Sequence, residues 1–223
     1  MTHGTRPPVR PWTSDGDRVT LARADRRLAL LAVSGPVVFT ASWWLLGAAT
    51  PGYDHARDSI SAVATTGHPF ALPMAAAFVW QGLAQLGNGW LLSRTGHRAL
   101  AAVLAGSGLG TLAVAALPLP ELGGAAWRGP AHTAAATLAL GLLHVAAGAG
   151  ALDTRLPGRV RALGAAALAV ALPCTWWFLR AGSTGTGGYA EKLMTTVLLA
   201  FTTAVVAAVV GRRTSPGTPR RVP

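Results

Sequence analysis

The sequence predicts an all-α membrane protein: a polytopic bundle of six transmembrane helices, with a short amphipathic helix in the first outer loop. Of the 223 residues, 51% are hydrophobic and 12% are charged, which is roughly half the charged fraction of a soluble domain. The charged residues gather near the two ends of the chain and in short gaps between long apolar stretches. Such a chain belongs in a bilayer and leaves no room for a separate soluble domain.

Six apolar runs each approach or reach the ~20 residues that cross a bilayer core. The runs cover residues 28–49, 70–92, 99–117, 131–152, 162–179 and 193–210. They define a transmembrane domain at 28–210, between a disordered basic tail at 1–27 and a second disordered basic tail at 211–223. An even number of spans places both tails on the same side of the membrane.

The basic residues are shared unequally between the two sides of this arrangement. Fifteen of the 19 lysines and arginines fall on the side of the termini, and four fall on the opposite side, namely Arg57, Arg128, Arg180 and Lys192. The positive-inside rule then predicts that both termini are cytoplasmic. The composition, rich in arginine and alanine, is typical of a GC-rich bacterial genome. We therefore expect a multi-pass protein of the cell (inner) membrane. The net charge of +11 is explained by topology and by contact with anionic membrane lipids, so we expect no nucleic-acid partner.

The first outer loop, residues 51–69, is a polar stretch between two apolar runs. Asp58 or Ser59 can cap a short helix there. One face of that helix would be apolar, carrying Ile60, Val63 and Ala64. We therefore expect an amphipathic helix that lies across the outer mouth of the bundle.

The second apolar run carries Gln81, Gln85 and Asn88, and the spacings of four and three residues place all three on one helix face. Polar side chains within a membrane face other helices rather than lipid. A rise of about 1.5 Å per residue places His144, in the fourth run, at a depth similar to the two glutamines. We therefore expect His144 to reach a glutamine amide, either as a neutral core histidine or as a proton relay or pore-lining group of a small transporter.

The sequence predicts no metal site and no cofactor. Cys174 is the single cysteine and lies within an apolar run, where a small buried packing residue is expected. His132 and His144 are too far apart on one helix to ligate the same haem. The spacing Gly106-x-x-x-Gly110 indicates close helix packing rather than a phosphate loop, because no strand precedes it.

A second group of polar residues is placed on the outer face by the topology. It comes from the first loop and from the starts of the fourth and sixth helices, and comprises Tyr53, Asp58, Ser59, His132, Glu191 and Lys192. These residues can cap helices and pair charges across loops, or bind a small ligand, a lipid headgroup or a partner. They also contain the parts of a membrane-embedded hydrolase or lipid-modifying enzyme that would use His132 with Asp58 or Glu191. We favour a non-enzymatic protein that binds a lipid, a small ligand or a partner at this face, and we assign no catalytic residue.

The pattern on this face resembles the DUF998 family of six-helix prokaryotic integral membrane proteins, which have no assigned function. The resemblance covers residues 28–210 and rests on short motifs: Tyr53 with Asp58-Ser59-Ile60-Ser61, a glycine-rich helix ending at Pro118, His132, and Gly188-x-x-Glu191-Lys192. The residues after Ile60-Ser61 depart from the usual I-S-x-L-G form. The architecture is also similar to the Frag1/DRAM-like six-helix proteins. The resemblance implies a fold and supplies no catalytic residues.

Overall fold

The computed structural model describes residues 15–121, 123–181 and 185–214, and most of these residues are helical. The described residues form six long α-helices and one short 3₁₀ helix, without strands. In chain order these are α1 (Asp15–Ala48), η1 (Ile60–Ala64), α2 (Ala71–Ser93), α3 (Arg98–Ala116), α4 (Arg128–Leu152), α5 (Gly158–Ala181) and α6 (Gly187–Thr214). The all-helical fold class is therefore confirmed.

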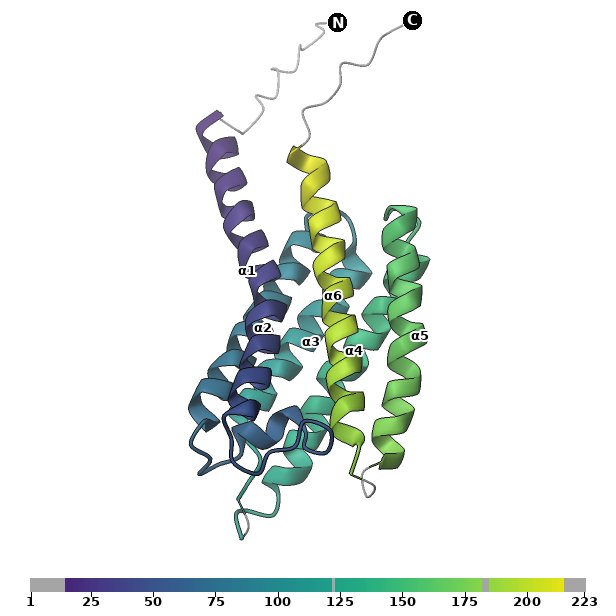
Figure 1. Cartoon of the computed structure of the whole chain (residues 1–223). Coiled ribbons are helices and arrows are strands. Elements are labelled where there is room, and N and C mark those ends of the chain that lie inside the picture. Colours follow the sequence, from purple (N-terminus) through teal and green to yellow (C-terminus); the bar gives the residue numbers. More distant parts are fainter. Residues whose placement is uncertain (1–14, 122, 182–184, 215–223) are drawn as a thin grey trace, which may run out of the picture.

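The six long helices run side by side along one axis, and successive helices run in opposite directions (Figure 1). The ends of α1, α3 and α5 and the starts of α2, α4 and α6 lie at one end of the bundle, which we call the loop end. The start of α1, the end of α6 and the turns at 94–97 and 153–157 lie at the opposite end, which we call the terminal end.

Helix α6 occupies the centre of the bundle. It packs against α1, α2, α4, α5 and η1, whereas α5 packs against α4 and α6. In the most apolar stretch of each helix, 56% of α6 is buried inside the protein and 22% of α5. Polar residues on α6 are consequently placed inside the bundle rather than against lipid.

Five helices are long and apolar enough to cross a membrane: α1 from Arg27 to Ala48, α3, α4, α5, and α6 from Gly187 to Val209. These helices indicate a multi-pass membrane protein. Helix α2 has the length but is not among the five. Its buried amide residues Gln81, Gln85 and Asn88 lower its hydropathy while facing other helices.

The helix boundaries extend beyond the predicted transmembrane domain at both ends. Helix α1 begins at Asp15, inside the tail predicted for 1–27, and α6 continues to Thr214. No proline occurs between Pro11 and Pro36, so nothing in the sequence interrupts a helix before the apolar run begins. The remaining parts of the two predicted tails, 1–14 and 215–223, lie outside the described residues.

The predicted close packing at the glycines of α3 is present. A Cβ atom added at Gly110 would lie 3.0 Å from the Cα atom of Ala139, and one added at Gly106 would lie 2.9 Å from the Cδ1 atom of Leu142. Both contacts are with α4. The absence of side chains at these positions lets α3 and α4 approach closely.

The short helix of the first loop differs from the prediction. Four of its five residues, Ile60, Ser61, Val63 and Ala64, are buried, and the helix contacts α1, α2 and α6. An exposed polar face, which would make it amphipathic, is not seen. The sequence ISAVA is small and mostly apolar, so the segment fits between the helix ends instead of lying across them.

Candidate functional site

The first loop is fastened to α6 by Lys192. The buried ammonium group of Lys192 donates hydrogen bonds to the carbonyl oxygens of Asp58 (2.6 Å), His55 (3.1 Å) and Gly188 (3.4 Å). It also lies 5.2 Å from the ring centre of Tyr53. All three N–H groups of this buried cation are thereby used, which is the condition for burying it at acceptable cost.

Gly188 lies where the same loop crosses the start of α6. The Tyr189 amide donates to the Ala56 carbonyl at 3.1 Å. A Cβ atom added at Gly188 would lie 2.5 Å from the carbonyl oxygen of Asp58 and 2.9 Å from that of His55. The motif Gly188-x-x-x-Lys192 therefore explains how the loop backbone lies directly on the helix.

The loop candidates Tyr53, Asp58 and Ser59 hold the loop together. The Tyr53 hydroxyl donates to the Ser59 carbonyl at 3.0 Å, and burial, with the nearby carboxylates, raises the pKa of Tyr53. The Asp58 carboxylate accepts from the Arg57 guanidinium at 2.9 Å and from the Asp54 amide at 2.8 Å. The hydrogen bond from Arg57 lowers the pKa of Asp58. Ser59 occupies the N-cap position of the short helix, one of the two predicted, but its side chain makes no capping hydrogen bond.

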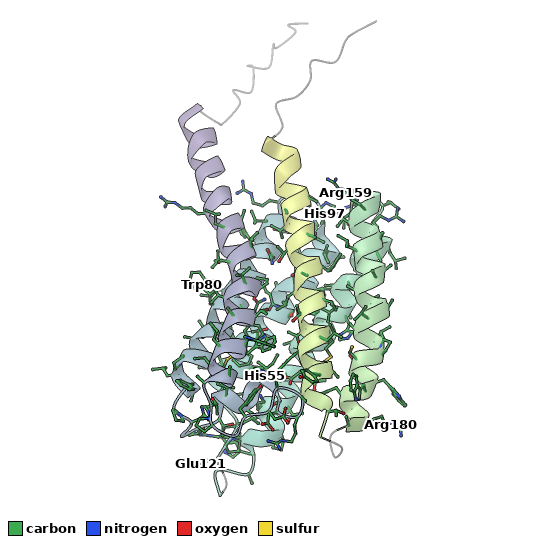
Figure 2. The ribbon with its side chains drawn as sticks, in the orientation of Figure 1. His55, Trp80, His97, Glu121, Arg159 and Arg180 are labelled. Carbon is green, nitrogen blue, oxygen red and sulfur yellow. The ribbon has the colours of Figure 1, made fainter. Side chains whose placement is uncertain are left out.

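His55 lies at the loop end among aromatic rings (Figure 2). Its ring stacks on Trp44 with centroids 4.7 Å apart and meets Tyr53 edge-on at 5.0 Å. Burial, and then the charge of Lys192, lower the pKa of His55. This arrangement favours the neutral imidazole as a packing element of the loop.

The amide of Ile60, at the start of η1, donates a hydrogen bond to the carboxylate of Glu191 on α6. Glu191 Oε2 accepts the Ile60 N–H at 3.0 Å, across 131 positions of sequence. Among the described residues, no Lys, Arg or His lies within ion-pair distance of the Glu191 carboxylate, and no second hydrogen bond reaches it. Glu191 is buried, so a carboxyl group with one hydrogen-bond donor from the described chain lies inside the bundle next to the loop end.

A cavity opens beside Glu191, between α1, η1, α2, α3, α4 and α6. The volume open to the centres of water-sized molecules is about 50 Å³. Its polar lining consists of Ser61, Gln81, Gln85, Thr111, Glu191 and Thr195, and its apolar lining includes Phe39 and Phe78. We call this space the α6 cavity.

Two polar side chains of the α6 cavity lack partners within the described chain. Both amide atoms of Gln81 and the hydroxyl of Thr195 are buried without a hydrogen bond. Their residues are 2% and 5% exposed, respectively. Buried polar groups are normally hydrogen-bonded, and an unpaired one costs about 1–3 kcal/mol. The α6 cavity therefore has unused capacity to bind a polar ligand or water.

The polar stripe on α2 divides between two environments. Gln85 Oε1 accepts the Thr111 hydroxyl at 3.0 Å inside the cavity lining. Asn88 is also buried, and neither of its amide atoms has a partner in the described chain. Gln81, Gln85 and Asn88 thus share the buried face that their spacing predicts.

The expected contact between His144 and a glutamine amide is wrong. His144 Nε2 lies 2.9 Å from the Thr175 hydroxyl of α5, and its Nδ1 lies 2.8 Å from the Leu140 carbonyl. The helix rise gives a depth along the bundle, but depth does not say which helices are neighbours. Helix α4 packs against α3, α5 and α6, so His144 turns to α5.

His132 is buried at the start of α4, where its Nδ1 lies 2.7 Å from the Leu117 carbonyl at the end of α3. No hydrogen bond joins His132 to Asp58 or Glu191 in the described chain, and His132 does not line the α6 cavity. The described residues therefore show no hydrogen-bonded link between His132 and either carboxylate of the hydrolase alternative. His132 instead ties together the two helices on either side of the second loop.

Sequence analysis missed Thr195 and Thr111. Thr195 follows Glu191 by four residues, so both lie on one face of α6, and this signal was available in the sequence. Within the described residues, no group of three His, Cys, Asp or Glu side chains could hold a metal ion.

Comparison with known proteins places the chain in one family. A search of curated proteins and of solved structures gave no match. One family model matches residues 33–220, and it is described as a protein of unknown function, DUF998. This match covers most of the chain and agrees with the resemblance of its motifs, and the chain belongs to the DUF998 family.

Proposed function

We propose that this is a multi-pass protein of the bacterial inner membrane that binds a small polar ligand in the α6 cavity and does not catalyse a reaction. In this proposal all six long helices cross the membrane and both termini are cytoplasmic. The loop end then faces outward, because it carries four of the 19 basic residues. The first loop and η1 cover the outer side of the cavity.

The unpartnered polar groups of the α6 cavity carry this proposal. Gln81 and Thr195 line the same cavity as Glu191, and their polar side-chain atoms are buried without hydrogen bonds in the described chain. A membrane bundle that needed only packing would place apolar residues here, because polar side chains at this depth are costly. Ionisable groups inside membrane bundles are functional candidates for the same reason.

The positions of the other candidates argue against catalysis. Asp58 is paired with Arg57, and His132 is bonded to a backbone carbonyl outside the cavity. A hydrolase needs a nucleophile and a base within hydrogen-bond reach of each other. The hydrogen bonds of the described residues supply no such pair.

Transport of the ligand is a second candidate, favoured by Asn88. This unpartnered amide lies seven residues after Gln81 on the same helix, or about 10 Å further toward the terminal end. The polar lining of α2 therefore continues past the cavity. His144 takes no part in it, since it is bonded to α5.

Thiol labelling tests whether the cavity admits small polar molecules. In a Cys174→Ala background, Thr195→Cys should react with the small cationic reagent 2-aminoethyl methanethiosulfonate. Thr202→Cys is the matched control, because Thr202 lies further along α6, is fully buried and does not line the cavity. Equal and slow labelling of the two variants would contradict the proposal.

The orientation has its own test in intact cells. Glu121 and Thr154 are exposed at the loop end and the terminal end, respectively. In the same cysteine-free background, an impermeant thiol reagent should label Glu121→Cys and leave Thr154→Cys unlabelled. The reverse pattern would overturn the proposed topology.

A further inference from the structure

We infer that the ligand of the α6 cavity is a monovalent inorganic cation of the sodium class, with Glu191 as its counter-charge. This inference rests on the proposed function, because it names the chemistry of the ligand that the cavity takes. Three observations support it: the charge of the lining, the kind of atoms that lack partners, and the size of the space.

The lining of the cavity holds one carboxylate and no cationic side chain. Glu191 is the ionisable residue of the lining, which contains no Lys, Arg or His. Lys192 is adjacent in sequence but directs its ammonium group to the loop carbonyls of Asp58 and His55. Ionising a buried carboxyl group that has no cation beside it is costly, and a bound cation offsets that cost. An anionic ligand would meet the carboxylate and find no cationic group.

The unpartnered groups are of the kind that coordinate hard cations. Carboxylate, carbonyl and hydroxyl oxygens are the preferred ligands of such ions, and the cavity supplies them from Glu191, Gln81 and Thr195. The Ile60 amide binds Oε2 of Glu191 and leaves the other carboxylate oxygen without a described donor. Phe39 and Phe78, whose ring centres are 5.0 Å apart, complete the lining and can favour a cation through their faces.

The size and charge of the site favour one small monovalent ion. The cavity volume is about 50 Å³, and one water needs about 10–15 Å³ on this measure. There is room for an ion with one or two waters, but not for a lipid headgroup. One carboxylate balances one positive charge, and a divalent ion would leave an excess charge buried in the bundle.

Thermal unfolding in matched salts tests the inference on the full-length protein in detergent. At pH 7.5 and constant ionic strength, 150 mM NaCl should raise the melting temperature above that in choline chloride by about 3–6 °C. KCl in the same series shows how well the site discriminates between the two ions. Glu191→Gln keeps an acceptor for the Ile60 amide and should lose the sodium-dependent increment.

Two further variants keep the test decisive. Glu121→Gln is the matched control, since Glu121 is exposed and outside the cavity, and it should keep the whole increment. Gln81→Leu should also reduce the sodium-dependent increment in melting temperature. This variant replaces Glu191→Gln as the test if Glu191→Gln does not fold. Equal melting temperatures of the wild type in sodium and choline, or an undiminished increment in Glu191→Gln, would overturn the inference.

The two proposals fail in different ways. If Thr195→Cys is labelled by the thiol reagent but sodium has no effect, the cavity is a ligand site and the cation assignment is wrong. If Thr195→Cys resists labelling as Thr202→Cys does, the proposed function itself is wrong.

Discussion

Glu191 and Lys192 are adjacent in the sequence and oppositely charged, yet the structure treats them differently. Lys192 uses all of its N–H groups on backbone carbonyls, two from the first loop and one from α6. Glu191 accepts one amide from the described chain and faces the α6 cavity. Consecutive residues of a helix point about 100° apart. Lys192 can therefore face the first loop while Glu191, on the same turn, faces the cavity.

In the loop region around Lys192, the ammonium, hydroxyl and carboxylate groups are hydrogen-bonded, although both ring nitrogens of His55 are buried there without a partner in the described chain. The cavity region around Glu191 differs, because amide and hydroxyl groups of its lining are unpaired. Lys192, Tyr53 and Asp58 all have hydrogen-bond partners within the chain. Gln81 and Thr195 have none in the described chain. The difference indicates that the first region stabilises the fold and that the second is open to a ligand, so each region should respond differently to substitution.

The largest effect is expected from Lys192→Met. The change removes a charged donor and leaves the Asp58 and His55 carbonyls unbonded under the loop. Hydrogen bonds to charged groups contribute about 1.5–3 kcal/mol each, so we expect a loss of roughly 3 kcal/mol or more. Thermal unfolding in detergent measures it. Arg180→Met is the control, since Arg180 is an exposed cation at the same end that stacks on Trp176, and a comparable loss there would remove the distinction.

A somewhat smaller loss is expected from Gly188→Ala. The added Cβ atom would lie 2.5 Å from the Asp58 carbonyl oxygen, which belongs to backbone and cannot rotate away. Such overpacking costs about 1–3 kcal/mol. In Gly129→Ala, at the start of α4, the Cβ atom meets nothing within 4 Å, so the melting temperature should stay the same or rise slightly. Equal melting temperatures for the two variants would show that the loop does not rest on α6 as described.

Much of this comparison could be predicted from the sequence, and the part that could not depends on long-range packing. The apolar runs predicted the long helices, and the motif Gly188-x-x-Glu191-Lys192 marked the right turn of α6. The spacing of four residues already separates Gly188 and Lys192 from Glu191 and Thr195. The bond from Ile60 to Glu191 spans 131 positions of sequence, and no local pattern predicts it.

The failed expectations have the same origin. His144 was paired with the glutamines of α2 by depth, but the lateral order of the helices decided its partner. The short helix was read as amphipathic from its own residues, but the pocket formed by α1, α2 and α6 buries four of its five residues. Periodicity describes one helix face, whereas the partner of that face is set by the whole bundle.

Substitution of Glu191 sharpens the comparison, because it should cost less than substitution of Lys192. Glu191→Gln keeps an acceptor for Ile60 and removes the buried charge, so we expect a change within about 1 kcal/mol in sodium-free buffer. Glu191→Leu also removes the acceptor, and the unbonded amide should cost about 1–2 kcal/mol. Both values come from thermal unfolding in choline chloride. A loss in Glu191→Gln as large as in Lys192→Met would place Glu191 in the stabilising region instead.

The smallest effect is expected from His55 and concerns pH. Burial and the Lys192 charge lower the pKa of His55 below its ordinary value of 6.5, so the unfolded chain binds a proton more readily than the folded one. The contribution of His55 is therefore complete above pH 6.5 and is lost as pH falls through its lowered pKa in the fold. The lowered pKa of Asp58 acts in the same direction but only in more acidic solution. Between pH 7.5 and 5.5, the melting temperature of the wild type should fall slightly relative to that of His55→Phe, which keeps an aromatic ring against Trp44. An equal change in melting temperature in both proteins would mean that the pH response arises outside the loop region. Only the substitutions of Lys192 and Glu191 would then distinguish the loop region from the cavity region.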